Sequence, residues 1–233
     1  MEVYTNTINK GYSVLVNKDN ICPNDLNFKI IDVNSRYAAN RKAEETAFLA
    51  FKEFQKYALA QGYDIEIESG YRAKEYQEKV FNECALKKGL EHAQKYVAPP
   101  GYSEHQTGLA LDICLKVNGK FIIENYLPED FNKFLKDNAK NYGFILRYPK
   151  GKENITGYNY EPWHIRYVGK ELAEYIDSND LTLEEYYEQK KLQNWFNYNK
   201  KEIIYNYFFL FLIIITIINI ILIINNVIDI IIK

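Results

Sequence analysis

The sequence predicts an α+β domain in which helices pack on an antiparallel sheet, followed by an apolar C-terminal tail. Three observations support this class. The 233 residues are 47% hydrophobic and 26% charged, which is a globular composition. Short alternating stretches typical of strands occur beside a two-residue hairpin signal, and the helical stretches between them do not follow a regular β-α-β order.

The first half of the chain contains two predicted helices around one strand. Residues 36–61 form the first helix, because apolar side chains recur at helical spacing before Gly62, namely Ala47, Phe51, Phe54 and Ala58. Residues 64–69 alternate polar and apolar side chains, as a half-buried strand does, and lead into Arg72. Residues 73–88 form the second helix, which Gly89 ends.

A hairpin follows in the middle of the chain. Residues 109–117 and 120–123 read as two strands, and Asn118-Gly119 between them is the pair that favours a two-residue hairpin turn. Asp112 therefore lies on a hairpin strand.

The remaining elements complete the predicted sheet and its helices. Phe131, Phe134 and Leu135 indicate a helix that ends at Tyr142-Gly143. The sequence then predicts strands at 144–147 and 164–168, a helix at 170–176, and a capping box at 182–185 that begins a further helix.

The end of the chain differs in composition from the rest. We expect a domain over residues 14–188, a Lys/Asn/Tyr-rich linker over 189–206 and a hydrophobic segment over 207–224. About eighteen apolar residues can just cross a bilayer, so this segment is a candidate membrane anchor, and Lys200 and Lys201 favour a cytoplasmic domain. Two alternatives stay open, a tail without function and a buried core helix. Residues 1–20 show no secretory signal, which leaves the cell envelope and the cytoplasm as locations.

Charge and cysteine content limit the classes of partner. The net charge of -2 with interleaved signs gives no basic stripe, so nucleic acid is not expected as a partner. The three cysteines match no disulfide framework or metal knuckle. Cys114 lies two residues after Asp112, so on a strand both side chains point to the same face, but burial in the core without a function is the favoured interpretation of Cys114.

Two short segments carry the residues of a metal site. His105 and Asp112 are seven residues apart, too far on one helix to share an ion, so the chain must turn between them, and Gly108 allows that turn. His164 opens a later strand and completes two histidines and one carboxylate, which leaves a fourth zinc position open for water. Glu161, three residues before His164, is the candidate general base for hydrolysis of a peptide bond.

The same residues resemble a known family. Ser-x-His-x-x-Gly-x-Ala-x-Asp at 103–112, with Glu-x-x-His at 161–164, is similar to the D-alanyl-D-alanine carboxypeptidases of the VanY type, within the lysostaphin-like and D-Ala-D-Ala zinc metallopeptidases. The resemblance implies a hedgehog/D-Ala-D-Ala-peptidase-like fold and zinc on His105, Asp112 and His164. It also implies Glu161 as catalytic base, and Arg72, Gln77 and Ser103 as substrate contacts, with Arg72 acting on the scissile carbonyl or the terminal carboxylate.

The expected function is therefore removal of a terminal D-alanine from peptidoglycan stem peptides or their precursors. The bond to that alanine can be D-Ala-D-Ala or L-residue-D-Ala, because the choice depends on pocket shape around one stereocentre. A phage-type peptidoglycan endopeptidase and a non-catalytic zinc-stabilised binding module are the two alternatives. Biological role and oligomeric state do not follow from these residues.

Overall fold

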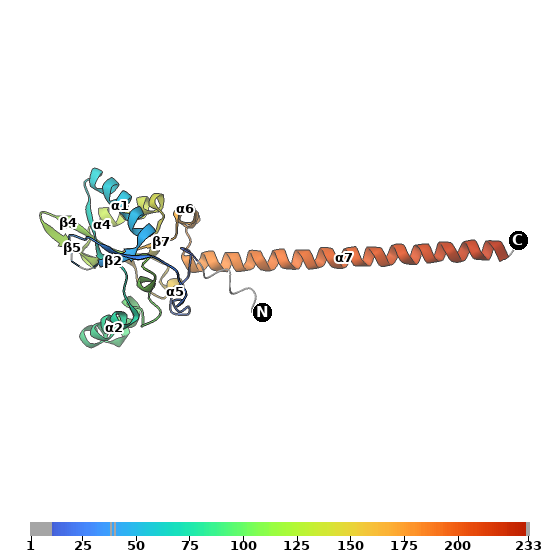
Figure 1. The fold of residues 1–233 in the computed structure, drawn as a ribbon, viewed down its shortest axis with the longest axis horizontal. Helices are drawn as coiled ribbons and strands as arrows, with labels where there is room; N and C mark the ends of the chain where they lie inside the picture. Colours follow the sequence, from blue (N-terminus) through green and yellow to red (C-terminus); the bar gives the residue numbers. More distant parts are fainter. Residues whose placement is uncertain (1–10, 38, 40, 232–233) are drawn as a thin grey trace. The chain divides into compact units, whose positions relative to one another are not determined.

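The computed structural model describes residues 11–37, 39 and 41–231 (Figure 1). The chain divides into two units, Met1–Tyr186 and Tyr187–Lys233. The first unit contains the sheets and all predicted site residues. The second unit contains most of the C-terminal helix.

The main sheet is antiparallel, as the sequence predicts. Its strands run in the order β3-β4-β7-β6, and β5 pairs with β4 as the outer strand of a hairpin. A separate two-stranded sheet joins β1 to β2. The strands are β1 Ile30–Val33, β2 Arg41–Glu44, β3 Asp64–Ser69, β4 Ala110–Val117, β5 Lys120–Ile122, β6 Phe144–Tyr148 and β7 Glu161–Tyr167.

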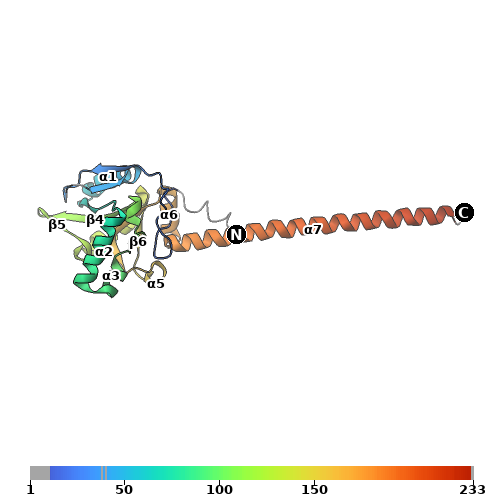
Figure 2. The ribbon, with the colours of Figure 1, turned by 60° about the horizontal axis from the view of Figure 1, so that its bottom comes forward.

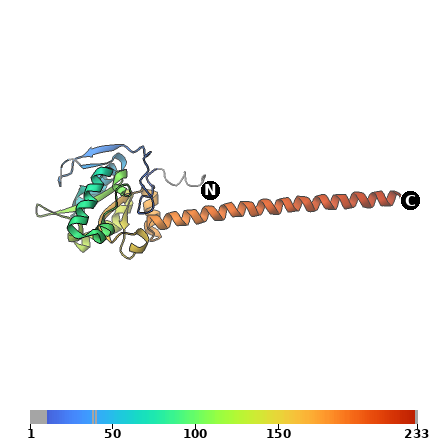
Figure 3. The same cartoon turned by 90° about the horizontal axis from the view of Figure 1, so that it is seen from below.

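Helices cover the sheet from both sides. Helices α1 and α4 lie over one side, whereas α2 and α3 lie together on the other side (Figures 1 and 2). The view from below places α2 and α3 in front of the sheet (Figure 3). The helices of this unit are α1 Glu45–Ala60, α2 Lys74–Lys88, α3 Leu90–Tyr96, α4 Glu129–Asn138, α5 Glu153–Thr156 and α6 Lys170–Ser178, with short 3-10 turns η1 Glu104–Thr107, η2 Glu124–Tyr126 and η3 Ala139–Tyr142.

The core lies between the sheet and the helices α1 and α4. The predicted helical stripe is buried: Phe51, Phe54 and Ala58 pack in this core, and Ala47 packs in a second, smaller cluster with Val14 and Leu109. Alternate side chains of β3 and β4 pack in the same layer as α4. Burial of these aliphatic and aromatic groups, at about 25 cal/mol per Å² of apolar surface, is the main stabilising contribution to this layer.

The first predicted helix begins later than the sequence suggests. The prediction of helix over 36–61 is wrong for residues 41–44, which form β2 and pair with β1, and residues 38 and 40 lie outside the described part. Helix α1 starts at Glu45 because the Glu44 carboxylate accepts a hydrogen bond from the Ala47 backbone N–H at 2.8 Å. Strand pairing between distant residues therefore overrides the local helical preference.

Two turns have the backbone that their residues predict. Asn118 and Gly119 both have positive φ, 50° and 79°, as the two-residue turn requires. Gly108 has φ 73°, and a Cβ there would lie 2.6 Å from the Ile30 side chain and 2.8 Å from the Glu44 backbone nitrogen. Only glycine satisfies both conditions, so Gly108 permits the turn that separates His105 from Asp112.

Three further differences concern short elements. Gly89 ends α2 as predicted, but α3 begins directly after it, and the sequence analysis found neither α3 nor α5. Strand β7 begins at Glu161 rather than at His164, with an irregularity in its pairing to β6 near Pro162. Proline has no N–H to give to the ladder, which accounts for the irregular pairing at that point.

The C-terminal helix α7 spans Leu183–Ile231. Its predicted capping box is present, because the Thr182 N–H donates to the Glu185 carboxylate at 2.7 Å and the Glu185 N–H donates to the Thr182 hydroxyl at 3.2 Å. The stretch Leu183–Ile218 is long and apolar enough to cross a membrane, by length and composition. Its most apolar window is 0% buried.

Candidate active site

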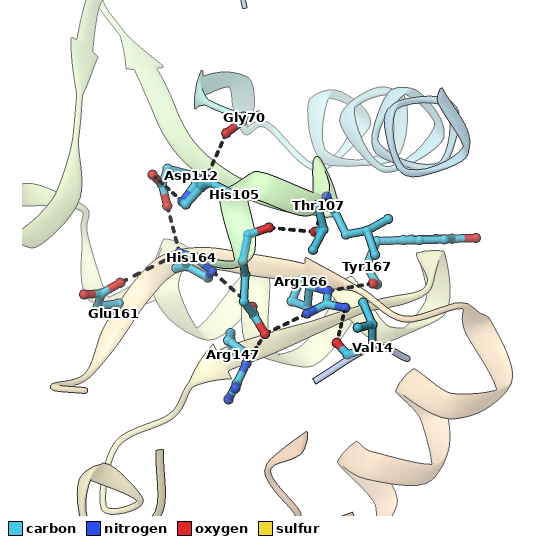
Figure 4. A network of polar contacts seen from close by, with 12 residues as sticks. Val14, Gly70, His105, Thr107, Asp112, Arg147, Glu161, His164, Arg166 and Tyr167 are labelled. Atoms are coloured by element: carbon cyan, nitrogen blue, oxygen red, sulfur yellow. Dashed lines mark hydrogen bonds and ion pairs between the residues drawn. The ribbon is translucent and has the colours of Figure 1, made fainter. Parts of the chain in front are cut away.

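The candidate site forms where the central strands β4 and β7 meet the turn η1. Asp112 on β4 pairs directly with His164 on β7, so their side chains are cross-strand neighbours. His105 comes from η1, and Glu161 begins β7. Figure 4 shows Asp112 between the two histidines, with Glu161 beside His164. The structure thus brings together all four residues that the two motifs predict.

The three predicted ligands present their donor atoms to one point. The donor atoms of His105, Asp112 and His164 all lie within 4.8 Å of one another, and the three residues are buried. The distance is 3.2 Å from His105 Nε2 to Asp112 Oδ2, and 3.1 Å from His164 Nδ1 to Asp112 Oδ1. Ligands at about 2 Å from a tetrahedral ion are separated by similar distances.

The hydrogen bond between His105 and Gly70 determines which ring nitrogen carries the lone pair. His105 Nδ1 lies 2.6 Å from the carbonyl oxygen of Gly70, which can only accept, so the ring proton belongs on Nδ1. Burial, together with the nearby Arg72 guanidinium, lowers the pKa of His105 to about 4. His105 is therefore neutral at physiological pH and offers a lone pair on Nε2.

The surroundings of His164 favour a positive charge. Burial lowers the pKa of His164, but the neighbouring carboxylates of Asp112, Glu104 and Glu161 outweigh it and raise that pKa to about 9. Burial likewise opposes ionisation of Asp112, yet His105, His164 and Arg72 hold its pKa well below its usual value. Two histidines and an ionised carboxylate in a field that attracts cations fit a divalent metal such as zinc.

Glu161 stands beside this donor set without belonging to it. Its Oε2 lies 3.8 Å from His164 Nδ1, and the residue is only 4% exposed. Burial raises the pKa of Glu161 to about 8, and a cation on the three donors would lower it again. A carboxylate in this position can accept a proton from a water molecule in the site.

Arg72 contacts the donor set directly. Its Nη2 lies 2.7 Å from both Asp112 Oδ2 and His105 Nε2, so the guanidinium occupies a position at which the donors attract a cation. Its Nε donates to the Ser69 hydroxyl and its Nη1 donates to the Gln77 carbonyl oxygen, at 3.0 and 3.2 Å. Arg72 has to turn away from Asp112 Oδ2 and His105 Nε2 for a metal ion to bind. Its side chain lines the pocket and is 15% exposed.

The other two predicted contacts also line the pocket. The cavity has a volume of about 820 Å³, and Gln77 and Ser103 are among its lining residues. The Gln77 amide is engaged at both ends, since it donates to the Ala98 carbonyl oxygen at 2.7 Å and accepts from Arg72. This arrangement makes Gln77 a support for Arg72, whereas Ser103 is buried at the pocket wall.

Two further residues lie near the site. Cys114 is buried, as expected for a core residue, and its thiol lies 3.5 Å from the Glu66 carbonyl oxygen, outside the group of donor atoms found among the described residues. Glu104, for which the sequence predicts no role, is buried beside His164. Its position directly before His105, a predicted metal ligand, was the signal available in the sequence, but nothing local indicates what Glu104 contacts.

Comparison with known proteins agrees with this geometry. Residues 40–170 match the family described as VanY, D-alanyl-D-alanine carboxypeptidase. The YodJ protein of Bacillus subtilis is 43% identical over 188 residues, which are 79% of this chain and 67% of YodJ. The bifunctional D-Ala-D-Ala dipeptidase and carboxypeptidase VanXYC of Enterococcus gallinarum is 38% identical over 141 residues, 59% of this chain and 74% of VanXYC.

Solved structures with the same fold include enzymes acting on both kinds of bond. The LD-carboxypeptidase LdcB superposes with a TM-score of 0.64 at 42% identity, covering 75% of this chain and 85% of LdcB. A glutamate-to-alanine mutant of the vancomycin-resistance D,D-pentapeptidase VanY was solved in complex with Zn(II). It superposes with a TM-score of 0.67 at 31% identity, covering 75% of this chain and 98% of the VanY chain. The predicted α+β fold and the predicted carboxypeptidase class are confirmed, and this chain belongs to the VanY family of D-alanyl-D-alanine carboxypeptidases.

Proposed function

We propose that this protein is a zinc-dependent carboxypeptidase that hydrolyses the bond to the terminal D-alanine of peptidoglycan stem peptides. The observation that carries the proposal is the set of three buried donors, His105, Asp112 and His164, with Glu161 beside them at the floor of one pocket. VanY and LdcB, whose folds match, are named as enzymes of this chemistry, and VanY binds zinc.

The residues divide the chemistry between them. When bound, zinc would polarise the scissile carbonyl and lower the pKa of a water molecule towards about 7. Glu161 accepts a proton from the attacking water and returns it to the nitrogen of the departing D-alanine. The C–N bond breaks as the water oxygen bonds to the carbonyl carbon, and the departing nitrogen receives one water proton through Glu161. The second water proton leaves the new carboxyl group and ends on the amine of D-alanine, so the products are a shortened peptide with a new carboxylate and free D-alanine.

Arg72 is suited to recognise the end of the substrate. Once turned off Asp112 and His105, its guanidinium can form two parallel hydrogen bonds with a carboxylate. The Gln77 side chain accepts a hydrogen bond from Arg72 and so fixes its position, and Ser103 contributes a hydroxyl to the lining of the same pocket. A cation at this position favours substrates that end in a free carboxylate, which is the property that separates a carboxypeptidase from an endopeptidase.

We expect the zinc-loaded protein to release one alanine from stem peptides, and a chelator to stop the reaction. Mass spectrometry of tetrapeptide and pentapeptide stems, each with a free or an amidated C-terminus, measures both effects. The stem that is shortened identifies the bond, and amidated stems should remain intact. Internal fragments or cleavage of amidated stems would instead indicate an endopeptidase, and intact stems with bound zinc would indicate a binding module.

The apolar part of α7 is proposed to anchor the domain of residues 14–188 to a membrane. Side chains at 207–218 are largely exposed, including Phe208, Leu210 and Ile213. We expect the full chain to sediment with membranes and a chain ending at Lys201 to remain in solution, with equal activity on soluble stems. Because a charge at the centre of a span costs about 3 kcal/mol, Ile213→Lys in the full chain should weaken membrane association as well. A full chain that stays in solution would contradict the anchor.

A further inference from the structure

Glu104 is a buried carboxylate whose two oxygens face different partners. It is 2% exposed and lies in η1 directly before His105. Its Oε1 accepts hydrogen bonds from Arg147 Nε at 2.8 Å and from Arg166 Nη1 at 2.6 Å. Two guanidinium groups on one oxygen compensate the negative charge of this buried carboxylate.

The second oxygen of Glu104 faces His164 on the edge opposite to the metal donors. The distance from Glu104 Oε2 to His164 Nε2 is 3.6 Å, and neither atom has a hydrogen-bond partner among the described residues. The other ring nitrogen, Nδ1, lies 3.1 Å from Asp112 Oδ1. The imidazole thus stands between one carboxylate in the metal site and another outside it, as Figure 4 shows for the side of Asp112.

The choice of tautomer connects these two edges. A neutral imidazole has one N–H and one lone pair, so His164 can offer Nδ1 to a metal only with its proton on Nε2. Glu104 Oε2 lies 3.6 Å from the nitrogen that would carry this proton. Metal-bound histidines commonly donate their second nitrogen to a carboxylate, which fixes the tautomer and the orientation of the ring.

We propose that Glu104 is a positioning residue, which holds His164 in the tautomer and orientation that present Nδ1 to the metal. The inference rests on the proposed role of His164 as a ligand. Glu104 does not touch substrate in this role, and it acts on the reaction through His164 alone.

The surrounding ion pairs provide a matched control. Arg147 also donates to both oxygens of Glu184, at 2.9 and 2.6 Å, and Glu184 lies in the first turn of α7. Arg166 donates to the carbonyl oxygen of Val14 at 2.7 Å. Glu184→Gln removes a carboxylate from the same buried arginine as Glu104→Gln, but the contacts of Glu184 do not include His164.

The two variants should differ in zinc affinity, measured by competition with a chromogenic chelator. In Glu104→Gln, the amide oxygen is expected to keep the hydrogen bonds from the arginines, so the NH₂ group points toward His164 Nε2. Because an NH₂ group donates, it favours a lone pair on Nε2 and the proton on Nδ1, which blocks Nδ1 from the metal. We expect Glu104→Gln to weaken zinc binding by about 10- to 100-fold and Glu184→Gln to leave it unchanged. Equal losses in both variants, or no loss in Glu104→Gln, would overturn the proposal.

A measurement on the unmodified chain covers the case in which Glu104→Gln does not fold. Nitrogen-15 NMR of the zinc-loaded protein reports which ring nitrogen of each of the three histidines carries a proton. We expect His164 to carry it on Nε2, in a slowly exchanging hydrogen bond. A proton on Nδ1 would overturn the proposal. Unchanged zinc binding in His164→Ala would instead remove the proposed ligand role itself, so the two failures are distinguishable.

Discussion

Replacing Glu161 with glutamine should reduce kcat by about 10³-fold or more while zinc content stays at one ion per chain. The amide has nearly the shape of the carboxylate but cannot accept the proton of the attacking water. Glu161 lies 3.8 Å from His164 Nδ1 and outside the group of three donors, so its loss removes no ligand.

The Glu161→Gln experiment compares turnover of the preferred stem with zinc content by mass spectrometry, and with the temperature of unfolding. An unfolding temperature equal to that of the parent shows that activity is not lost through misfolding. Loss of zinc together with activity would make Glu161 a ligand rather than the base. Retained turnover would show that another residue of the pocket acts as the general base.

Replacing His105 or His164 with alanine should remove both metal and activity. Each substitution leaves two protein donors, and the loss in zinc affinity should exceed the roughly 10- to 100-fold that accompanies removal of a hydrogen-bond partner outside the coordination sphere. Chelator competition measures the affinity, and stem hydrolysis measures the activity.

His92→Ala is the matched control for these substitutions. The His92 ring stacks on Tyr96 in α3 and is not one of the three grouped donors, so this variant should bind zinc as the parent does. Zinc binding and turnover retained in His164→Ala would contradict the assignment of ligands. Zinc loss in His92→Ala would show that the affinity reports general damage to the fold.

Features that depend on neighbouring residues could be predicted from the sequence. The capping box at Thr182 and Glu185 and the turn at Asn118-Gly119 are set by contacts within three residues, and both are present. The grouping of His105, Asp112 and His164 could be predicted because two of the three histidines of the chain lie in two short motifs. The roles of the individual site residues remain predictions.

Features that depend on distant partners could not be predicted. Residues 41–44 leave the helix because they pair with β1, and no local pattern shows that pairing. The register that sets Asp112 opposite His164 joins segments about fifty residues apart. From the sequence alone, Glu104 would be expected to be an exposed charge. In the fold, Arg147 from β6 and Arg166 from β7 form ion pairs with it inside the protein.

The pairing of Asp112 with His164 across β4 and β7 also determines how the protein can handle its metal. Both residues lie on strands that are joined by main-chain hydrogen bonds in the central sheet. The ring of His105 is held by a hydrogen bond from its Nδ1 to the Gly70 carbonyl oxygen. Little conformational entropy remains to be lost when these donors close on an ion. The backbone therefore sets the arrangement of these donors before an ion binds.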